Sequence, residues 1–197
     1  MALSKDVGLA GGCDIAAIKP YWSNAKNILD VSAGFGRAVS ALLQFGYAGQ
    51  ITAIERDAGF CRHMKHGVGE KIQVIQEDIR NLKLLDHKYD LILLLWSSIA
   101  DFPASEQASI VKKIAALRSE SGHIAIDTSP IGVFPPHAVA ECGPQTYVIQ
   151  AKHSVVRIYR PSQGEISRYA EQAGLQLVEM IPYKTDTNRD RILYIIG

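Results

Sequence analysis

Short apolar runs alternate along the chain with longer segments in which apolar residues recur at helical spacing. Five runs have the apolar content of buried strands: residues 28–31, 50–55, 71–76, 89–95 and 122–127. The segments with helical spacing are residues 38–43, 57–67, 105–118 and 164–173. Strands that alternate with helices predict an α/β fold with a mostly parallel sheet.

The end of the chain departs from this alternation. Residues 175–183 and 191–196 both have strand character, and only a polar turn joins them. Without a helix between them, these two strands must pair antiparallel. We therefore expect a three-layer sandwich on a mostly parallel seven-stranded sheet, with an antiparallel C-terminal hairpin.

Length, charge and cysteine content narrow the class of protein. The chain has 197 residues, which suits one domain spanning residues 1–197 with a substantial core. Lys and Arg total 21 against 20 for Asp and Glu, so no charge excess favours nucleic acid or an anionic membrane as partner. No apolar run approaches the length of a membrane span. Cys13, Cys61 and Cys142 form neither a disulfide framework nor a zinc pattern, which favours a cytoplasmic location.

A glycine turn follows the first predicted strand. Asp30 stands near the carboxyl end of that strand, and Gly34 and Gly36 come next. Glycine lets the backbone approach a ligand closely, and the start of the following helix offers free N–H groups. A dinucleotide site would need a third glycine where this chain has Val39, and Asp30 would repel a pyrophosphate. The pattern therefore favours a cationic ligand, or one rich in hydroxyl and amino groups.

Two further acids follow the second and third predicted strands. Glu55 ends the second strand, where its two oxygens can accept hydrogen bonds from a ribose diol. Asp78 comes just after the third strand. Ligands of open α/β sheets bind at the carboxyl ends of the strands, so we expect Asp30, Glu55 and Asp78 to gather there.

The run from Asp30 to Gly36 resembles the first motif of the class I S-adenosylmethionine (SAM)-dependent methyltransferases, Asp/Glu-x-Gly-x-Gly-x-Gly. Ser32 stands at the first glycine of that motif, and a small residue is tolerable there if its φ is negative. The C-terminal hairpin is also typical of this family. The resemblance covers residues 26–197 and implies the class I methyltransferase fold, with SAM as the cofactor.

The resemblance also implies which residues bind the cofactor. Glu55 would hold the ribose hydroxyls, Arg56 would lie along the adenine, and Asp78 would receive the adenine amino group. The segment that starts at Trp96 would lie beside the reactive methyl group. The complete set is Asp30, Ser32, Ala33, Gly34, Gly36, Glu55, Arg56, Asp78, Ile79 and Trp96.

Two segments outside the regular alternation are expected to cover the site. Residues 1–25 would form an N-terminal lid in which Tyr21 or Trp22 covers the cofactor, although large aromatic side chains more often serve packing. Residues 128–161 are rich in proline at first and then alternate like strands. Loops of this length are usually functional or disordered. We expect this insertion to form a cover over the substrate.

No residue stands out as catalytic. Asp127 ends the fifth strand and is a candidate for touching substrate, whereas His123 enters that strand at the opposite end and is expected to be structural. His137, His153 and Tyr159 are the available general bases in the insertion. Each of them is individually more typical of a surface or packing residue.

We therefore expect a methyltransferase that moves a methyl group from SAM to an N or O atom of a small molecule by in-line displacement. Ser97-Ser98-Ile99 resembles members that methylate small molecules, including aminosugar N-methyltransferases, and the motifs of DNA-base methyltransferases are absent. Two alternatives stay open: a nucleotide-cofactor oxidoreductase on a related fold, and a non-catalytic module that binds SAM or a partner. We predict no metal, and the sequence indicates neither the acceptor nor the oligomeric state.

Overall fold

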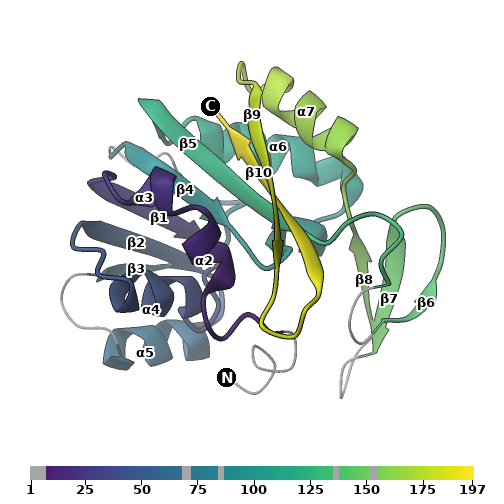
Figure 1. Cartoon of the computed structure of the whole chain (residues 1–197), viewed down its shortest axis with the longest axis horizontal. Helices are drawn as coiled ribbons and strands as arrows, with labels where there is room; N and C mark the ends of the chain where they lie inside the picture. Colours follow the sequence, from purple (N-terminus) through teal and green to yellow (C-terminus); the bar gives the residue numbers. More distant parts are fainter. Residues whose placement is uncertain (1–7, 68–71, 84–86, 135–137, 151–154) are drawn as a thin grey trace.

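The computed structural model describes residues 8–67, 72–83, 87–134, 138–150 and 155–197. Seven strands form its central sheet (Figure 1). They are β1 (Asn27–Val31), β2 (Gln50–Glu55), β3 (Ile72–Gln76), β4 (Tyr89–Leu94), β5 (Arg118–Thr128), β9 (Leu177–Lys184) and β10 (Asp190–Ile196). The order is β3-β2-β1-β4-β5-β10-β9, and β10 runs antiparallel to both β5 and β9. The prediction of a mostly parallel sheet closed by an antiparallel hairpin is confirmed.

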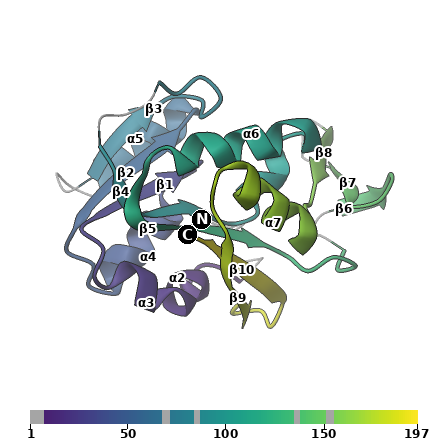
Figure 2. The same ribbon diagram turned by 90° about the horizontal axis from the view of Figure 1, so that it is seen from above.

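Helices cover both faces of this sheet (Figure 2). One face is covered by α2 (Cys13–Ala17), α3 (Lys19–Trp22), α4 (Arg37–Gln44) and α5 (Ala58–Gly67). The opposite face is covered by α6 (Ala104–Ala115) and α7 (Gln163–Gln172). Among the described residues, no helix is long and apolar enough to cross a membrane.

Strand side chains alternate between two apolar clusters, one for each face. Ile28 of β1 and Leu91 of β4 belong to the cluster under α4, whereas Leu29 and Ile92 belong to the cluster under α6. All four side chains have no exposed surface. Successive residues of a strand point to opposite faces, so a sheet covered on both sides needs continuous apolar runs. This requirement explains the uninterrupted runs in the sequence.

The insertion between β5 and α7 contains a second, antiparallel sheet that stands beside the central one (Figure 1). Its strands are β6 (Ala138–Glu141), β7 (Thr146–Gln150) and β8 (Val155–Tyr159). Tyr147 of β7 and Ile158 of β8 pack with Ala100, which lies in the 3-10 helix η1 (Ser98–Asp101). The sequence pattern predicted β7 and β8, but it did not predict β6, which is short and mostly exposed.

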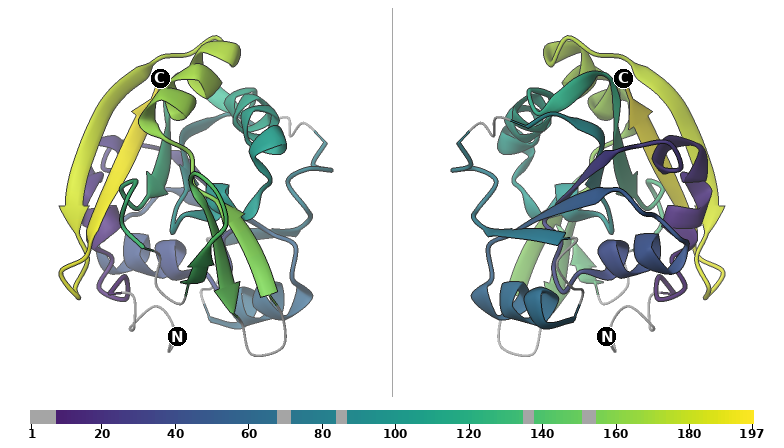
Figure 3. Two further views of the ribbon diagram at one scale, coloured as in Figure 1. Left: turned by 90° about the vertical axis from the view of Figure 1, so that its right-hand side faces the viewer. Right: turned by 90° about the vertical axis from the view of Figure 1, so that its left-hand side faces the viewer.

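The C-terminal hairpin forms the far edge of the central sheet (Figure 3). β9 is the edge strand, and its Val178 and Met180 side chains are exposed. β10 is the inner strand, with Leu193 and Ile195 fully buried. The sheet therefore has one central switch point, between β1 and β4, where the strand order reverses. Ligands of open α/β sheets bind at the carboxyl ends of the strands beside such a point.

Candidate active site

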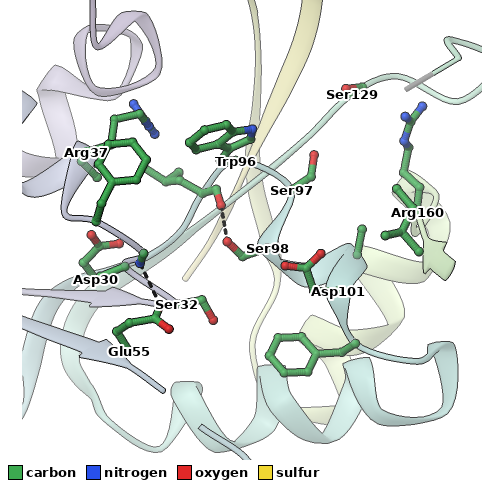
Figure 4. Close-up of a pocket in the computed structure, with 18 of the residues that line it drawn as sticks. Asp30, Ser32, Arg37, Glu55, Trp96, Ser97, Ser98, Asp101, Ser129 and Arg160 are labelled. Atoms are coloured by element: carbon green, nitrogen blue, oxygen red, sulfur yellow. Dashed lines mark hydrogen bonds between the residues drawn. The ribbon is translucent and has the colours of Figure 1, made fainter. Parts of the chain in front are cut away.

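A cavity of about 950 Å³ opens at the carboxyl ends of the central strands. Ligand pockets span about 300–1,000 Å³, so this cavity lies near the upper end of that range. In Figure 4, Asp30, Ser32 and Glu55 lie on one side of the pocket, Arg160 lies on the opposite side, and Asp101 lies between them. The second sheet and the turn between β9 and β10 also contribute to the wall.

Every residue predicted to bind the cofactor lines this cavity, with the exception of Gly36. Gly36 precedes α4 with a φ of 83°. A Cβ atom at this position would lie 2.8 Å from Cγ of Met64 on α5. Glycine is therefore required at 36 for packing between α4 and α5. The individual roles of the other residues toward a cofactor stay predictions.

Asp30 is buried at the end of β1 with an unsatisfied oxygen. The residue is 3% exposed, and its Oδ2 has no hydrogen-bond partner among the described residues. Burial raises the pKa of Asp30 to about 7; Arg37 opposes the increase, and Asp14 and Glu55 add to it. A buried acceptor without a donor costs stability. A ligand ammonium group would satisfy this oxygen and compensate its charge.

Glu55 is held by backbone groups on both of its oxygens. Oε2 accepts a hydrogen bond from the N–H of Gly34, and Oε1 accepts one from the N–H of Asp57, each at 2.8 Å. These bonds fix the carboxylate between the glycine turn and the start of α5. Each oxygen keeps a second lone pair, so Glu55 can still accept hydrogen bonds from a ribose diol.

Asp78 forms an ion pair with Arg80 that the sequence analysis did not predict. Its carboxylate accepts hydrogen bonds from the Arg80 guanidinium, at 2.6 Å to Nη2, and from the Arg80 backbone N–H. The guanidinium hydrogen bonds hold the pKa of Asp78 at about 2. Ile79, which is 4% exposed, adds an apolar surface beside this pair.

The backbone at Ser32 does not meet the condition stated for a non-glycine residue at this position of the motif. Its φ is 57°, in the left-handed region, so the negative φ that would make a small residue tolerable at this position is not present. A non-glycine residue in that conformation costs roughly 1–2 kcal/mol. Gly34 also has a φ of 57°, and no atom lies within 4 Å of the place where its Cβ would stand. The turn thus presents bare backbone to the cavity at Gly34.

The segment after β4 also has an unusual backbone. Trp96 and Ser97 both have positive φ, at 55° and 58°. Asp127 holds this segment through two bonds: its Oδ2 accepts from the N–H of Trp96 at 2.9 Å, and its carbonyl accepts from the N–H of Ser97 at 3.1 Å. The Trp96 ring stands edge-on to Phe35 at 6.1 Å and lies 5.8 Å from the Arg37 guanidinium.

Asp127 itself is fully buried and is not among the cavity residues. Its carboxylate accepts hydrogen bonds from the Tyr183 hydroxyl at 3.0 Å and from the Arg191 guanidinium, whose Nη2 lies 2.6 Å from Oδ2. Arg191 also donates to Ser97 Oγ at 2.8 Å. Asp127 therefore positions the loop after β4 and does not line the cavity.

Tyr21 and Trp22 do not line the cavity, nor does any other described residue of the predicted lid. The Tyr21 hydroxyl donates to Glu179 at 2.5 Å, and its ring stands edge-on to His123 at 4.9 Å. Trp22 is buried, and its indole N–H donates to the carbonyl of Ile15 at 2.8 Å. Residues 1–7 lie outside the described residues.

Of the three candidate general bases in the insertion, the structure describes Tyr159 alone. Tyr159 donates its hydroxyl to Glu165 at 2.5 Å, and burial raises its pKa to about 12. A phenol with that pKa stays protonated and is a poor base. His137 and His153 lie outside the described residues.

Asp101 and Arg160 are among the cavity residues that the sequence analysis did not predict as site residues. Asp101 ends η1 and is exposed, and the surrounding protein raises its pKa through desolvation. Arg160 follows β8 and is 2% exposed. Asp101 lies in the same loop as Trp96, which was predicted to line the site, so its place in the sequence could have identified it as a site residue. Arg160 carries no local signal, because its place depends on how the insertion folds.

Comparison with known proteins agrees with this geometry. Residues 28–122 match a family model described as a methyltransferase domain. No curated protein matches the chain.

Solved structures with the same fold cover almost the whole chain at low sequence identity. A SAM-dependent methyltransferase from Clostridium acetobutylicum has a TM-score of 0.71 and 13% identity, over 98% of this chain and 92% of that chain. A SAM-bound amino pentose methyltransferase from Micromonospora echinaspora has a TM-score of 0.72 and 12% identity, over 98% and 94%. The mitomycin 7-O-methyltransferase has a TM-score of 0.74 and 17% identity, over 98% and 55%. Residues 28–122 therefore resemble a methyltransferase domain, and the chain has the class I methyltransferase fold.

Proposed function

We propose that this chain transfers a methyl group from SAM to an N or O atom of a small-molecule acceptor. The observation that carries the proposal is the buried Oδ2 of Asp30 beside the cavity, which has no hydrogen-bond partner among the residues that the structure describes. The ammonium group of SAM would donate to this oxygen and neutralise the carboxylate. A dinucleotide would instead bring a pyrophosphate toward a buried negative charge, which is unfavourable.

Other residues around Asp30 fit the rest of SAM. Open space at Gly34 lets a ligand approach the backbone, because a side chain there would fill it. Glu55 keeps acceptor capacity for a ribose diol, and Ile79 supplies an apolar surface for adenine. When bound, SAM supplies an electrophilic methyl group on its sulfonium.

The acceptor would occupy the part of the cavity that the insertion lines. Phe134, Ile149 and Ile158 contribute apolar wall there. In this proposal residues 128–161 are the substrate cover of a single domain. The solved structures with the same fold include an amino pentose methyltransferase and a mitomycin 7-O-methyltransferase, which supports a small-molecule acceptor.

Asp101 is the acidic side chain best placed to receive a proton from the acceptor. It lines the cavity between Asp30 and Arg160 (Figure 4). Desolvation raises its pKa, and the nearby Arg56 opposes that increase. A raised carboxylate pKa improves a general base, which a hydroxyl acceptor needs more than a neutral amine does.

The test combines calorimetry with SAM and a transfer assay with isotope-labelled SAM on a panel of amines and phenols. We expect SAM to bind and at least one acceptor to be methylated. Glu55→Gln should weaken SAM binding by about 1–3 kcal/mol, the value of a hydrogen bond to a charged group. Glu120→Gln is the matched control, because Glu120 is exposed and lies outside the cavity.

Each alternative has its own outcome in this experiment. SAM binding without methylation of any acceptor favours the non-catalytic module. Tighter binding of a nicotinamide dinucleotide than of SAM favours the oxidoreductase. Equal SAM affinity of Glu55→Gln and the unchanged chain contradicts the ribose assignment.

A further inference from the structure

Three arginine side chains are buried in the wall of the cavity, and two of them have a buried carboxylate partner. Arg37 pairs with Asp14, and Arg191 pairs with Asp127; both aspartates are fully buried. Arg160 is 2% exposed, and no carboxylate of the described residues lies within ion-pair distance of it. Its guanidinium therefore has no ion-pair partner among the described residues.

The contacts that Arg160 does make are neutral. Its Nη1 donates to the carbonyl oxygens of Pro130 at 2.8 Å and Val133 at 2.6 Å. The guanidinium carbon lies 4.9 Å from the centre of the Tyr147 ring. No hydrogen bond within the described residues uses Nε or Nη2. Donors thus remain available on a group at the cavity wall.

Burial and a like charge both act against this cation. Desolvation lowers the pKa of Arg160 and the charge of Arg191 lowers it further, whereas Tyr147 and the Glu141 carboxylate oppose this decrease. An ion buried without a counter-ion costs several kcal/mol, and carbonyl dipoles and an aromatic face offset only part of that. A ligand anion would supply the missing compensation.

The backbone of Arg160 is fixed before any ligand binds. Its N–H donates to the carbonyl of Gln145 at 2.9 Å, and its own carbonyl accepts from Gln145 Nε2 at 2.8 Å. The same Gln145 amide donates to Glu165 at 2.7 Å, at the start of α7. A side chain on such a supported backbone loses little freedom when it binds, which favours affinity.

We propose that Arg160 binds an anionic group of the methyl acceptor, so that the acceptor is a small molecule carrying a carboxylate or a phosphate. This inference rests on the proposed function, because it treats the outer part of the cavity as the acceptor site. The planar guanidinium suits bidentate contact with either anion. Ile149, Ile158 and Phe134 beside it suit an apolar body on the same molecule. Arg160 lies opposite Asp30 in Figure 4, so the two charges mark the two ends of the site.

The experiment compares anions with neutral molecules of similar shape. Benzoate is titrated against benzamide, and phenyl phosphate against phenol, by calorimetry of the unchanged chain with and without S-adenosylhomocysteine. We expect one anion or both to bind at least tenfold more tightly than the neutral counterpart. The benzoate and phenyl phosphate arms tell a carboxylate site from a phosphate site. Equal binding of anion and neutral molecule in both pairs overturns the proposal.

Two variants test whether the anion binds at Arg160. Arg160→Met should reduce anion affinity to that of the neutral molecule, whereas Arg157→Met should change nothing. Arg157 is the matched control, since it lies on β8 but is exposed and outside the cavity. Undiminished anion binding by Arg160→Met overturns the proposal. If that variant does not fold, Arg160→Lys replaces it, and a loss of at least fivefold in anion affinity is expected because the bidentate fork is gone.

Failure of the proposed function is visible separately. If S-adenosylhomocysteine does not bind but the anions do, Arg160 marks an anion site and the SAM assignment is wrong. If S-adenosylhomocysteine binds and no anion preference is found, the methyltransferase proposal stands and the role of Arg160 is structural.

Discussion

The carboxyl ends of β1 and β5 each carry a buried aspartate, but the two carboxylates have opposite surroundings. Asp127 on β5 accepts hydrogen bonds from the Trp96 N–H, the Tyr183 hydroxyl and the Arg191 guanidinium. Asp30 on β1 has an Oδ2 without any partner among the described residues. Both residues belong to the same sheet and lie at the same edge of it.

The difference distinguishes a carboxylate that stabilises the fold from one that binds a ligand in the proposed function. The charge of Asp127 is compensated by Arg191 as soon as the chain folds, and this ion pair fixes the loop that starts at Trp96. In the described part of the chain, Arg37 is the cation that acts on the charge of Asp30, and Arg37 is already paired with Asp14. Position at the carboxyl edge is therefore insufficient to identify a ligand residue, and the set of partners decides.

Breaking the Asp127 pair should have the largest effect. Asp127→Ala leaves Arg191 buried without a counter-ion, which costs about 3–5 kcal/mol when one partner of a buried pair is removed. Urea unfolding followed by circular dichroism measures this loss in the free energy of unfolding.

An exposed ion pair serves as its control. Lys184→Met removes the partner of Asp190, and both side chains are more than half exposed, at 58% and 64%. Surface pairs contribute about 0–1 kcal/mol, so this variant should be nearly as stable as the unchanged chain. A similar, small loss for both variants would contradict the structural role of Asp127.

The sequence was sufficient for the sheet and for the β1 side of the site. Strand adjacency follows from the alternation of strands and helices, so Asp30, Glu55 and Asp78 could be placed at one edge. The outer side of the cavity depends on contacts between distant segments. Arg160 reaches the wall because β7 and β8 pack on η1, and no local pattern predicts that packing.

Backbone conformation and side-chain pairing are two further features that could not be predicted from the sequence. The positive φ of Ser32 was not predicted, although glycine at that position of the resembled motif was the available signal. The bond between Asp127 and Arg191 depends on the register of β5 against β10, in which Leu193 lies opposite Asp127. Register follows from side-chain packing in the folded sheet, and the strand pattern alone does not determine it.

A smaller effect on stability should distinguish Asp30 from an ordinary acid. With a folded pKa of about 7, Asp30 keeps its proton on folding while the unfolded carboxyl ionises near pH 4. The unfolded state then binds fewer protons, so Asp30 lowers stability progressively from about pH 4 to pH 7. Asp30→Asn removes this penalty, and its stability relative to the unchanged chain should rise by about 2–4 kcal/mol over that range.

The measurement is urea unfolding of both proteins at several pH values between 5 and 8. Burying the amide of Asp30→Asn changes the free energy of unfolding by an amount that does not depend on pH. The test is therefore how the difference in free energy of unfolding between the two proteins changes with pH. Glu120→Gln, which alters an exposed acid, should show no such change. A difference between Asp30→Asn and the unchanged chain that is independent of pH would show that the pKa of Asp30 is ordinary.

The smallest expected effect links Asp30 to the ligand itself. An ammonium group binds the ionised carboxylate better than the protonated one, so binding competes with the proton on Asp30. With the pKa of Asp30 near 7, the affinity for S-adenosylhomocysteine should rise up to about tenfold per pH unit below 7, or roughly 1.4 kcal/mol, and level off above it. Calorimetry at pH 5.5, 6.5 and 7.5, in buffers of different ionisation enthalpy, measures both the affinity and the proton released. Asp78, with a pKa of about 2, stays ionised throughout and does not contribute. Asp30→Asn should bind S-adenosylhomocysteine more weakly at pH 7.5, and its affinity should no longer depend on pH. An unchanged pH dependence in this variant would show that a residue other than Asp30 titrates.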